Sequence, residues 1–419
     1  MHKVDFCATI YWFNIESFYA LEVIALEKIM DLIARETKGQ SFKTFKYPLD
    51  ATDKPSILYE YDDEKREIKW NELAETDSAV AEIDLRKLSD DVADNTIFTY
   101  FLDGSRRTFK VDDVGYEKKK GGRMLVLPVV AGQIGVGCLK RENRIVKSEK
   151  FIGQNVISLP NEANPNPAIR NGFYEAKLSL LNKMELLSRI DIQFDAVLEY
   201  KTATPATGKE VSYEDRAVAK IQDAMIETEQ NMVAELVKAN KLGQDNYLLK
   251  DGSLEYRTVD KFKRNSNEEK TFLNRYNYVI GASKKFNPES CHDKNNKPNP
   301  GYIANLKLYH RTPVARFKNE SINNMQFAVW FVRIRDKRYS SSPFDGVLKL
   351  EKMLTKEQEI NNGIDSELVN YITACIINER NPVCYGKDTR WANHLYPIYL
   401  TELYVKSKYM SKEMFLNLF

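Results

Sequence analysis

Two segments of this chain place Asp-Gly-Ser directly after a run of apolar residues, and they constrain its fold more than any other feature. FLDGSRRTFK carries Asp103, and YLLKDGSLEY carries Asp251. Apolar runs of this kind are typical of buried strands, and Gly-Ser after an aspartate favours a turn. We therefore expect each strand to end at its aspartate, where α/β sheets place their ligands.

The remaining pattern predicts a mixed α/β core. The run at 123–139, interrupted by Pro128 and several glycines, predicts paired buried strands, and two more apolar runs predict strands over 276–284 and 325–335. We expect an N-terminal helical and mixed segment over 1–95, followed by the main domain over 96–419. Apolar spacing predicts helices at 15–37, 74–88, 213–240 and 355–379.

Composition excludes several classes of protein. The 62 basic and 60 acidic residues nearly balance, so any surface that binds a polyanion has to be local. The five cysteines are scattered without a CxxC pair, which favours reduced thiols over a disulfide frame or a zinc site. We find neither a signal-peptide pattern nor an apolar stretch of about 18 residues, so we expect a cytoplasmic protein without membrane attachment.

Carboxylates from different elements suggest a metal site. Aspartates at the ends of two strands, joined by a glutamate from the long helix between them, can bind divalent cations through hard oxygen ligands. Glu229 and Glu235 flank the apolar stripe of the helix on opposite sides, and the sequence does not choose between them. Two such ions would suit hydrolysis of a phosphodiester. The alternative is that Asp103 and Asp251 only form turns and that the glutamates are solvated.

At this point the chain resembles the NurA nucleases. The resemblance covers about 96–410 and depends on the order and spacing of FLDGSRR, LPVVAGQIGVG, the acidic helix, NYLLKDGSL, YVIGASKK and LYPIYLTELY. It implies a fold in the α/β class, an RNase H-like mixed sheet flanked by helices. It also implies that Mn2+ or Mg2+, as two ions, is bound by Asp103, Asp251 and either Glu229 or Glu235.

The C-terminal motif departs from the family pattern. Tyr396, followed by Pro397, matches the family's Tyr-Pro pair and is expected in the catalytic site. The family has a histidine eight residues after the tyrosine, whereas this chain has Tyr404 there. His394 is a candidate substitute, although a lone histidine is more often structural.

The resemblance further implies partners and a setting. It implies a homodimer with a central DNA channel, a HerA-type hexameric ATPase as partner, and a role in DNA repair by end processing or in anti-phage defence. Basic residues near the motifs are candidates for DNA contacts through phosphates: Arg106, Arg107, Lys284 and Lys285. The alternatives are a catalytically degenerate DNA-binding adaptor of the ATPase, or another RNase H-fold nuclease of the transposase or Argonaute kind.

Overall fold

The structure is a computed structural model, and it describes most of the chain. The described residues are 27–44, 46–50, 68–77, 82–117, 122–166, 170–203, 211–256, 266–293, 295, 297–319, 325–337, 342–380 and 392–419. Among them, no helix is both long and apolar enough to cross a membrane.

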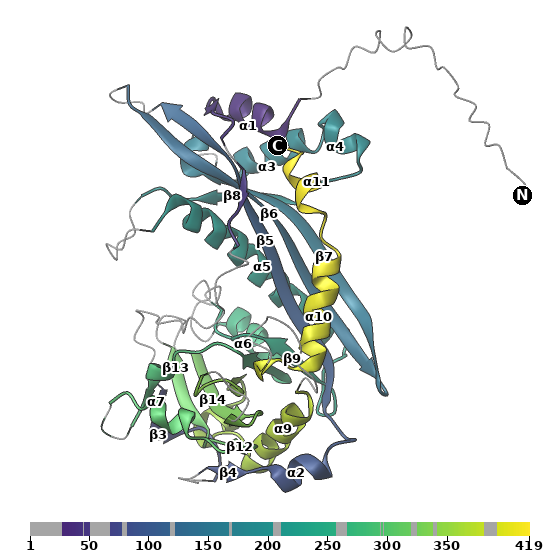
Figure 1. Cartoon of the computed structure of the whole chain (residues 1–419), viewed down its shortest axis with the longest axis vertical. Coiled ribbons are helices and arrows are strands. Elements are labelled where there is room, and N and C mark those ends of the chain that lie inside the picture. The colour runs from purple at the N-terminus through teal and green to yellow at the C-terminus, as the bar shows by residue number, and fades with distance from the viewer. Residues whose placement is uncertain are drawn as a thin grey trace, which may run out of the picture.

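One mixed sheet runs through the molecule (Figure 1). In the described residues its main path contains eleven strands in the order β11-β3-β13-β14-β15-β10-β9-β5-β6-β7-β8. Its centre consists of β5 (Phe98–Glu117), β6 (Met124–Glu142), β7 (Ile145–Pro160), β9 (Tyr247–Asp251) and β10 (Val279–Ser283).

This centre has the predicted RNase H-like arrangement. Strands β5, β6 and β7 are successive antiparallel neighbours, while β9 joins the other side of β5 in parallel and β10 continues in parallel with β9. The long helix α5 (Tyr213–Lys238) lies between β8 (Ala196–Tyr200) and β9 in the chain. The predicted mixed α/β fold, a large sheet flanked by helices, is confirmed.

Further strands extend the sheet. They are β3 (Ile68–Leu73), β11 (Cys291–His292), β13 (Ala315–Asn319), β14 (Met325–Arg333) and β15 (Val347–Met353). Four short strands pair off the main path: β1 (Gln40–Ser41), β2 (Tyr47–Pro48), β4 (Ile83–Asp84) and β12 (His310–Arg311). The boundary at residue 95 stays a prediction about folding; β1 and β2 pair with β5, and β3 pairs with β13, across that position.

Helices cover both faces of the central strands and both ends of the sheet (Figure 1). Strands β10 and β14 and helix α5 confirm the predictions for those segments. The described helices other than α5 are α1 (Ile29–Thr37), α2 (Arg86–Asp91), α3 (Arg170–Leu181), α4 (Glu185–Arg189), α6 (Asn267–Arg275), α7 (Pro300–Ala304), α8 (Glu357–Asn362), α9 (Ser366–Asn378), α10 (Tyr396–Ser407) and α11 (Lys412–Leu416).

Three helix predictions need comment. The helix predicted at 15–37 begins only at Ile29, after an extended Lys28, and the part before residue 27 lies outside the described residues. The helix predicted at 74–88 was wrong, because the N–H of Ala74 donates to the sheet at Val314 and α2 begins only at Arg86. The helix predicted at 355–379 is two helices, since Gly363 breaks it with φ +82° where it packs against the backbone of Ala74.

The predicted strand ends were also partly wrong. Asp103 lies inside β5, which continues for 14 residues beyond it, instead of at its end. Likewise, 123–139 belongs to the single strand β6. Its glycines do not break the strand; they let helices approach, since a Cβ on Gly137 would lie 2.6 Å from Val405 of α10. The strand before Asp251 does end there, and Gly252 turns with φ +81°.

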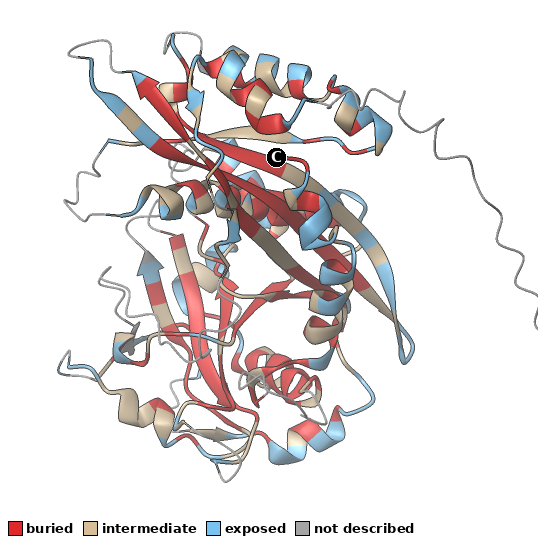
Figure 2. Cartoon of the chain, turned by 45° about the horizontal axis from the view of Figure 1, so that its top comes forward, coloured by how far each residue is buried: buried red, intermediate tan, exposed pale blue. Residues whose placement is uncertain are grey.

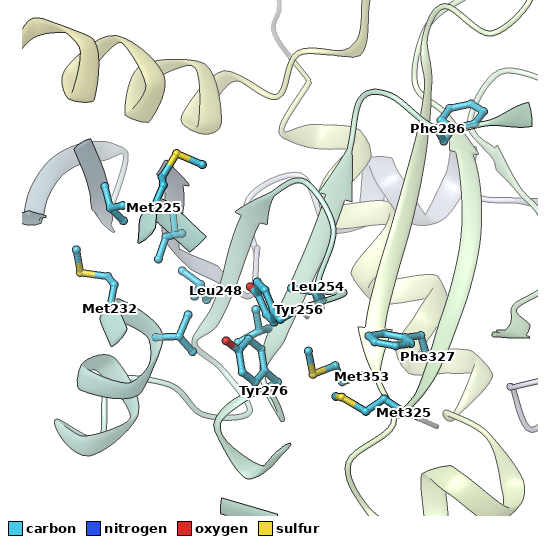
Figure 3. Packing of buried hydrophobic residues seen from close by; sticks show 14 of the residues in the cluster. Met225, Met232, Leu248, Leu254, Tyr256, Tyr276, Phe286, Met325, Phe327 and Met353 are labelled. Carbon is cyan, nitrogen blue, oxygen red and sulfur yellow. The ribbon is translucent and has the colours of Figure 1, made fainter. Parts of the chain in front are cut away.

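The core lies on both faces of the sheet. The middle of β6 is almost entirely buried and β5 is buried except for half-buried positions such as 104–107, whereas the outer end of the β6–β7 hairpin is exposed (Figure 2). One buried cluster joins α5 to β9, β14 and β15 (Figure 3). In it the rings of Tyr256 and Tyr276 pack with centroids 5.5 Å apart. The ring centroid of Tyr256 lies 5.8 Å from Nζ of Lys250, the residue before Asp251.

Candidate active site

A polar pocket opens where β5, β9 and β10 lie side by side, beneath α10. Its volume is about 460 Å³. It contains both predicted aspartates and acidic and basic side chains from four elements. The lining residues are Asp103, Gly104, Ser105, Arg106, Asp251, Gly252, Ser253, Ser283, Lys284, Lys285, Glu402 and Lys406.

Parallel pairing brings the two aspartates together. Leu102 of β5 is in register with Lys250 of β9, so the next residue on each strand is Asp103 or Asp251. Asp103 is 6% exposed. Burial first, and then the charges of Asp251 and Glu402, raise the pKa of Asp103 well above its ordinary value. The pocket therefore holds carboxylates that repel one another in a poorly solvated place.

Lys284 offsets part of this negative charge. Its Nζ lies 3.1 Å from Oδ2 of Asp251 and 3.9 Å from Oε2 of Glu402. Burial opposes a charge on Lys284, but the carboxylates of Asp251, Asp103 and Glu402 outweigh it and raise the pKa of the lysine. Lys284 is thus an ammonium held among three carboxylates, where it also lowers the pKa of Asp103.

Of the two candidate glutamates on α5, only one lies near the pocket. Glu229 is buried, and its Oε2 lies 3.0 Å from Nζ of Lys250. Burial raises the pKa of Glu229, and the Lys250 ammonium offsets part of that rise. Glu235 is exposed and pairs with Lys150, away from the pocket lining. The two glutamates differ because they are six residues apart, a spacing that places their side chains on different sides of α5.

Some of the predicted basic residues line the pocket and one does not. Arg106 and Lys285 line the pocket, together with Lys406, which the sequence did not single out. Arg106 pairs with Asp50. Arg107 points elsewhere: its guanidinium stacks 4.8 Å from the ring centroid of Tyr409.

The tyrosine motif does not contribute to the pocket lining. Tyr396 begins α10, is 44% exposed, and donates its N–H to the carbonyl of Glu379. Tyr404, at the family's histidine position, points to β7, where its hydroxyl lies 2.7 Å from that of Ser148. His394 is buried beside the ring of Tyr399. Neither side chain lines the pocket.

Glu402 is the pocket residue that sequence reasoning missed. It lies on α10 and pairs with Lys406 one turn later, 2.6 Å away. The only signal in the sequence is a carboxylate six residues after Tyr396, on the helix that the motif begins. Nothing in that spacing shows that α10 packs over β5 and β6.

Comparisons with known proteins give a match among solved structures but none among family models or curated proteins. Among solved structures, the crystal structure of the NurA nuclease from Sulfolobus solfataricus matches with 11% identity and a TM-score of 0.38, covering 77% of this chain and 83% of that one.

The chain resembles a NurA nuclease. This is the resemblance that the motifs predicted. At this identity and TM-score the match carries nothing about activity, so we base function on the geometry of the pocket.

The pocket fits a divalent cation in one part and not in another. Asp103, Asp251 and Glu402 supply the hard oxygen donors that Mg2+ and Mn2+ prefer, and their mutual repulsion is what a cation would relieve. However, within the described residues no three acidic, His or Cys side chains are gathered closely enough to bind a metal as they stand. Lys284 lies between two of the carboxylates, and Glu229 is paired with Lys250.

Proposed function

We propose that this protein is a metal-dependent DNA nuclease of the NurA kind that hydrolyses phosphodiester bonds. The observation that supports it best is Asp103, a buried carboxyl in an open pocket whose pKa is raised by burial and by neighbouring carboxylates. Perturbed carboxyls gathered in a pocket are typical of functional sites.

Three carboxylates are the proposed ligands. Asp103, Asp251 and Glu402 would hold Mn2+ or Mg2+, and Lys284 would yield its place between them. When bound, such an ion supplies a Lewis acid for the phosphate and a water of lowered pKa. Arg106, Lys285 and Lys406 line the same pocket and would bind the phosphates that flank the scissile bond; Lys284 would join them.

Cleavage by an Asp103→Ala variant tests this function. Wild-type protein is incubated with linear double-stranded and single-stranded DNA in Mn2+ or Mg2+, and we expect products that EDTA suppresses. Asp103→Ala should lose activity by more than about 100-fold. Removing a residue that only supports a metal ligand costs up to about 100-fold, and removing a proposed ligand should cost more. Asp113→Ala, on the same strand but paired with Lys110, is the matched control. Full activity in Asp103→Ala would refute the assignment.

The wider setting is proposed from the resemblance alone. We infer a homodimer that works in the cytoplasm with a HerA-type hexameric ATPase, either in DNA end processing or in anti-phage defence. Light scattering of the purified chain tests the dimer. Co-purification with an ATPase from the native host tests the partner, and a monomer that retains no ATPase would contradict both.

A second candidate is a DNA-binding adaptor without catalysis. Two observations favour it: lysines already neutralise carboxylates in and beside the pocket, and Tyr404 points away from the pocket. An adaptor would bind DNA equally well with and without divalent ions and would give no products in any condition. The same incubation, followed by a gel-shift assay in EDTA, separates the two candidates.

A further inference from the structure

We propose that Lys250 takes the place of a divalent cation at Glu229, so that the site binds one ion fewer than the resemblance to a two-metal nuclease implies. This inference rests on the proposed function for its meaning, since it concerns how many ions the nuclease would use. It makes Glu229 a partner of Lys250 and not a metal ligand. Lys250 is then a positioning residue, which fixes a negative charge beside the reacting centre.

The ion pair is closed to solvent. The side chains of Lys250 and Glu229 are each 5% exposed, and Nζ lies 3.0 Å from Oε2. Nζ also donates to the carbonyl of Asp251 at 2.7 Å. Breaking a buried pair leaves an uncompensated charge, which has a large cost in free energy. An incoming ion would have to displace the ammonium against that cost.

Neighbouring groups enclose the pair on two sides. A Cβ on Gly104 would overlap Oε1 of Glu229, so β5 closes directly over the carboxylate. On another side, Nζ lies 5.8 Å from the ring centroid of Tyr256, which packs on Tyr276 (Figure 3). Lys250 therefore fills a cation position made by a carboxylate, a carbonyl and an aromatic ring.

Lys284 provides the contrast. It lines the open pocket, whereas neither Lys250 nor Glu229 belongs to the pocket lining. Lys284 can turn toward solvent or a bound phosphate and free Asp251 and Glu402. Lys250 has no such route, so only the Lys284 position can exchange its ammonium for a divalent ion.

Counting bound Mn2+ tests the inference. Calorimetric titration of the full chain without DNA gives the number of ions for each variant. Lys250→Met, which removes the ammonium but keeps the side chain's bulk, should bind about one more ion than wild type. Glu229→Gln should bind the same number as wild type. The double variant Lys250→Met/Glu229→Gln should return to the wild-type number, because the extra ion needs the carboxylate.

Two results would overturn the inference: Lys250→Met that binds no extra ion, or Glu229→Gln that loses one. Should Lys250→Met fail to fold by circular dichroism, Glu229→Gln alone decides. Lys150→Met and Glu235→Gln, which break the exposed pair between β7 and the same helix α5, are matched controls and should leave the count unchanged. Failure of the proposed function is distinguishable, because it appears as absent cleavage by wild type whatever the ion counts are.

Discussion

At the scale of residues, the ionised side chain of Asp103 destabilises the folded protein. It is buried inside a strand, and the carboxylates of Asp251 and Glu402 raise its pKa further. A carboxyl whose pKa is raised on folding stabilises the protein most below its unfolded pKa of about 3.9, and that contribution is lost as pH rises toward the folded pKa. Active sites often accept such destabilising charges.

The first prediction follows from this dependence of stability on pH. Asp103→Asn removes the charge but keeps the shape, so it should be more stable than wild type at pH 7, by about 1 kcal/mol. The gain should shrink as pH falls toward about 4, where the carboxyl of the unfolded chain begins to be protonated as well. Thermal unfolding from pH 4 to pH 8 in chelator measures the difference. Asp113→Asn, which loses its pair with Lys110, should show no such gain; a less stable Asp103→Asn at every pH would contradict the assignment.

Local sequence could identify only part of the site. Asp103 and Asp251 are visible because each follows an apolar run, and parallel pairing then brings them together. Lys250 precedes Asp251 directly, yet no local rule indicates that it points back to Glu229. Glu402 depends on how a distant helix packs. Charge partners of this kind come from tertiary contacts, which neither propensity nor periodicity encodes.

At the scale of elements, the packing of α10 on β6 builds one wall of the pocket. Gly135 and Gly137 leave room for Val405, whose methyl carbons would lie 2.7 and 2.6 Å from a Cβ added at these positions. This close approach carries Glu402 and Lys406 to the pocket. Glycine in a strand often marks such a contact.

The second prediction concerns that contact. Gly137→Ala should displace α10, lower the free energy of unfolding by about 1–3 kcal/mol, and weaken Mn2+ binding through Glu402. Urea unfolding and calorimetry are the measurements. Val405→Ala in the same chain should restore much of both, since it makes room for the new methyl group. Gly301→Ala, where the added Cβ would lie 3.7 Å from Oδ1 of Asn299, is the control; a double variant no better than Gly137→Ala would reject this packing.

Element types were largely predictable, whereas their ends were not. Helical apolar spacing located α5, which buries one face, and apolar runs located β10 and β14, which are buried on both faces. The strand that holds Asp103 continues because β6 pairs with it throughout, which overrides the turn preference of Gly-Ser. Similarly, Gly363 ends α8 because the chain there meets the backbone of Ala74. Both outcomes depend on partners distant in sequence.

At the scale of the whole molecule, a buried charge network joins the first hundred residues to the rest. Glu75 accepts hydrogen bonds from Arg311, from the N–H of Val314 and from the hydroxyl of Ser366, at 2.7 to 3.3 Å. Arg311 is 1% exposed. The segment before residue 95 is therefore held by a network in which each polar partner is satisfied.

The third prediction concerns cooperativity. Glu75→Ala leaves Arg311 buried without its carboxylate, which should cost about 3–5 kcal/mol. In urea, followed by tryptophan fluorescence, we expect one transition at a lower midpoint. Glu185→Ala, which removes an exposed pair with Arg189, should hardly change it. An early transition confined to the N-terminal segment, with the main transition unmoved, would instead support 1–95 as an independently folding unit.

The position of Asp103 deep within a long ladder has an evolutionary consequence. Paired neighbours on both sides fix its place, with Gly137 of β6 opposite it and β9 on its other flank. Insertions or deletions at the far tips of these strands would leave that register untouched. The tips are thus free to diversify toward new partners, while the chemistry at the middle is inherited unchanged.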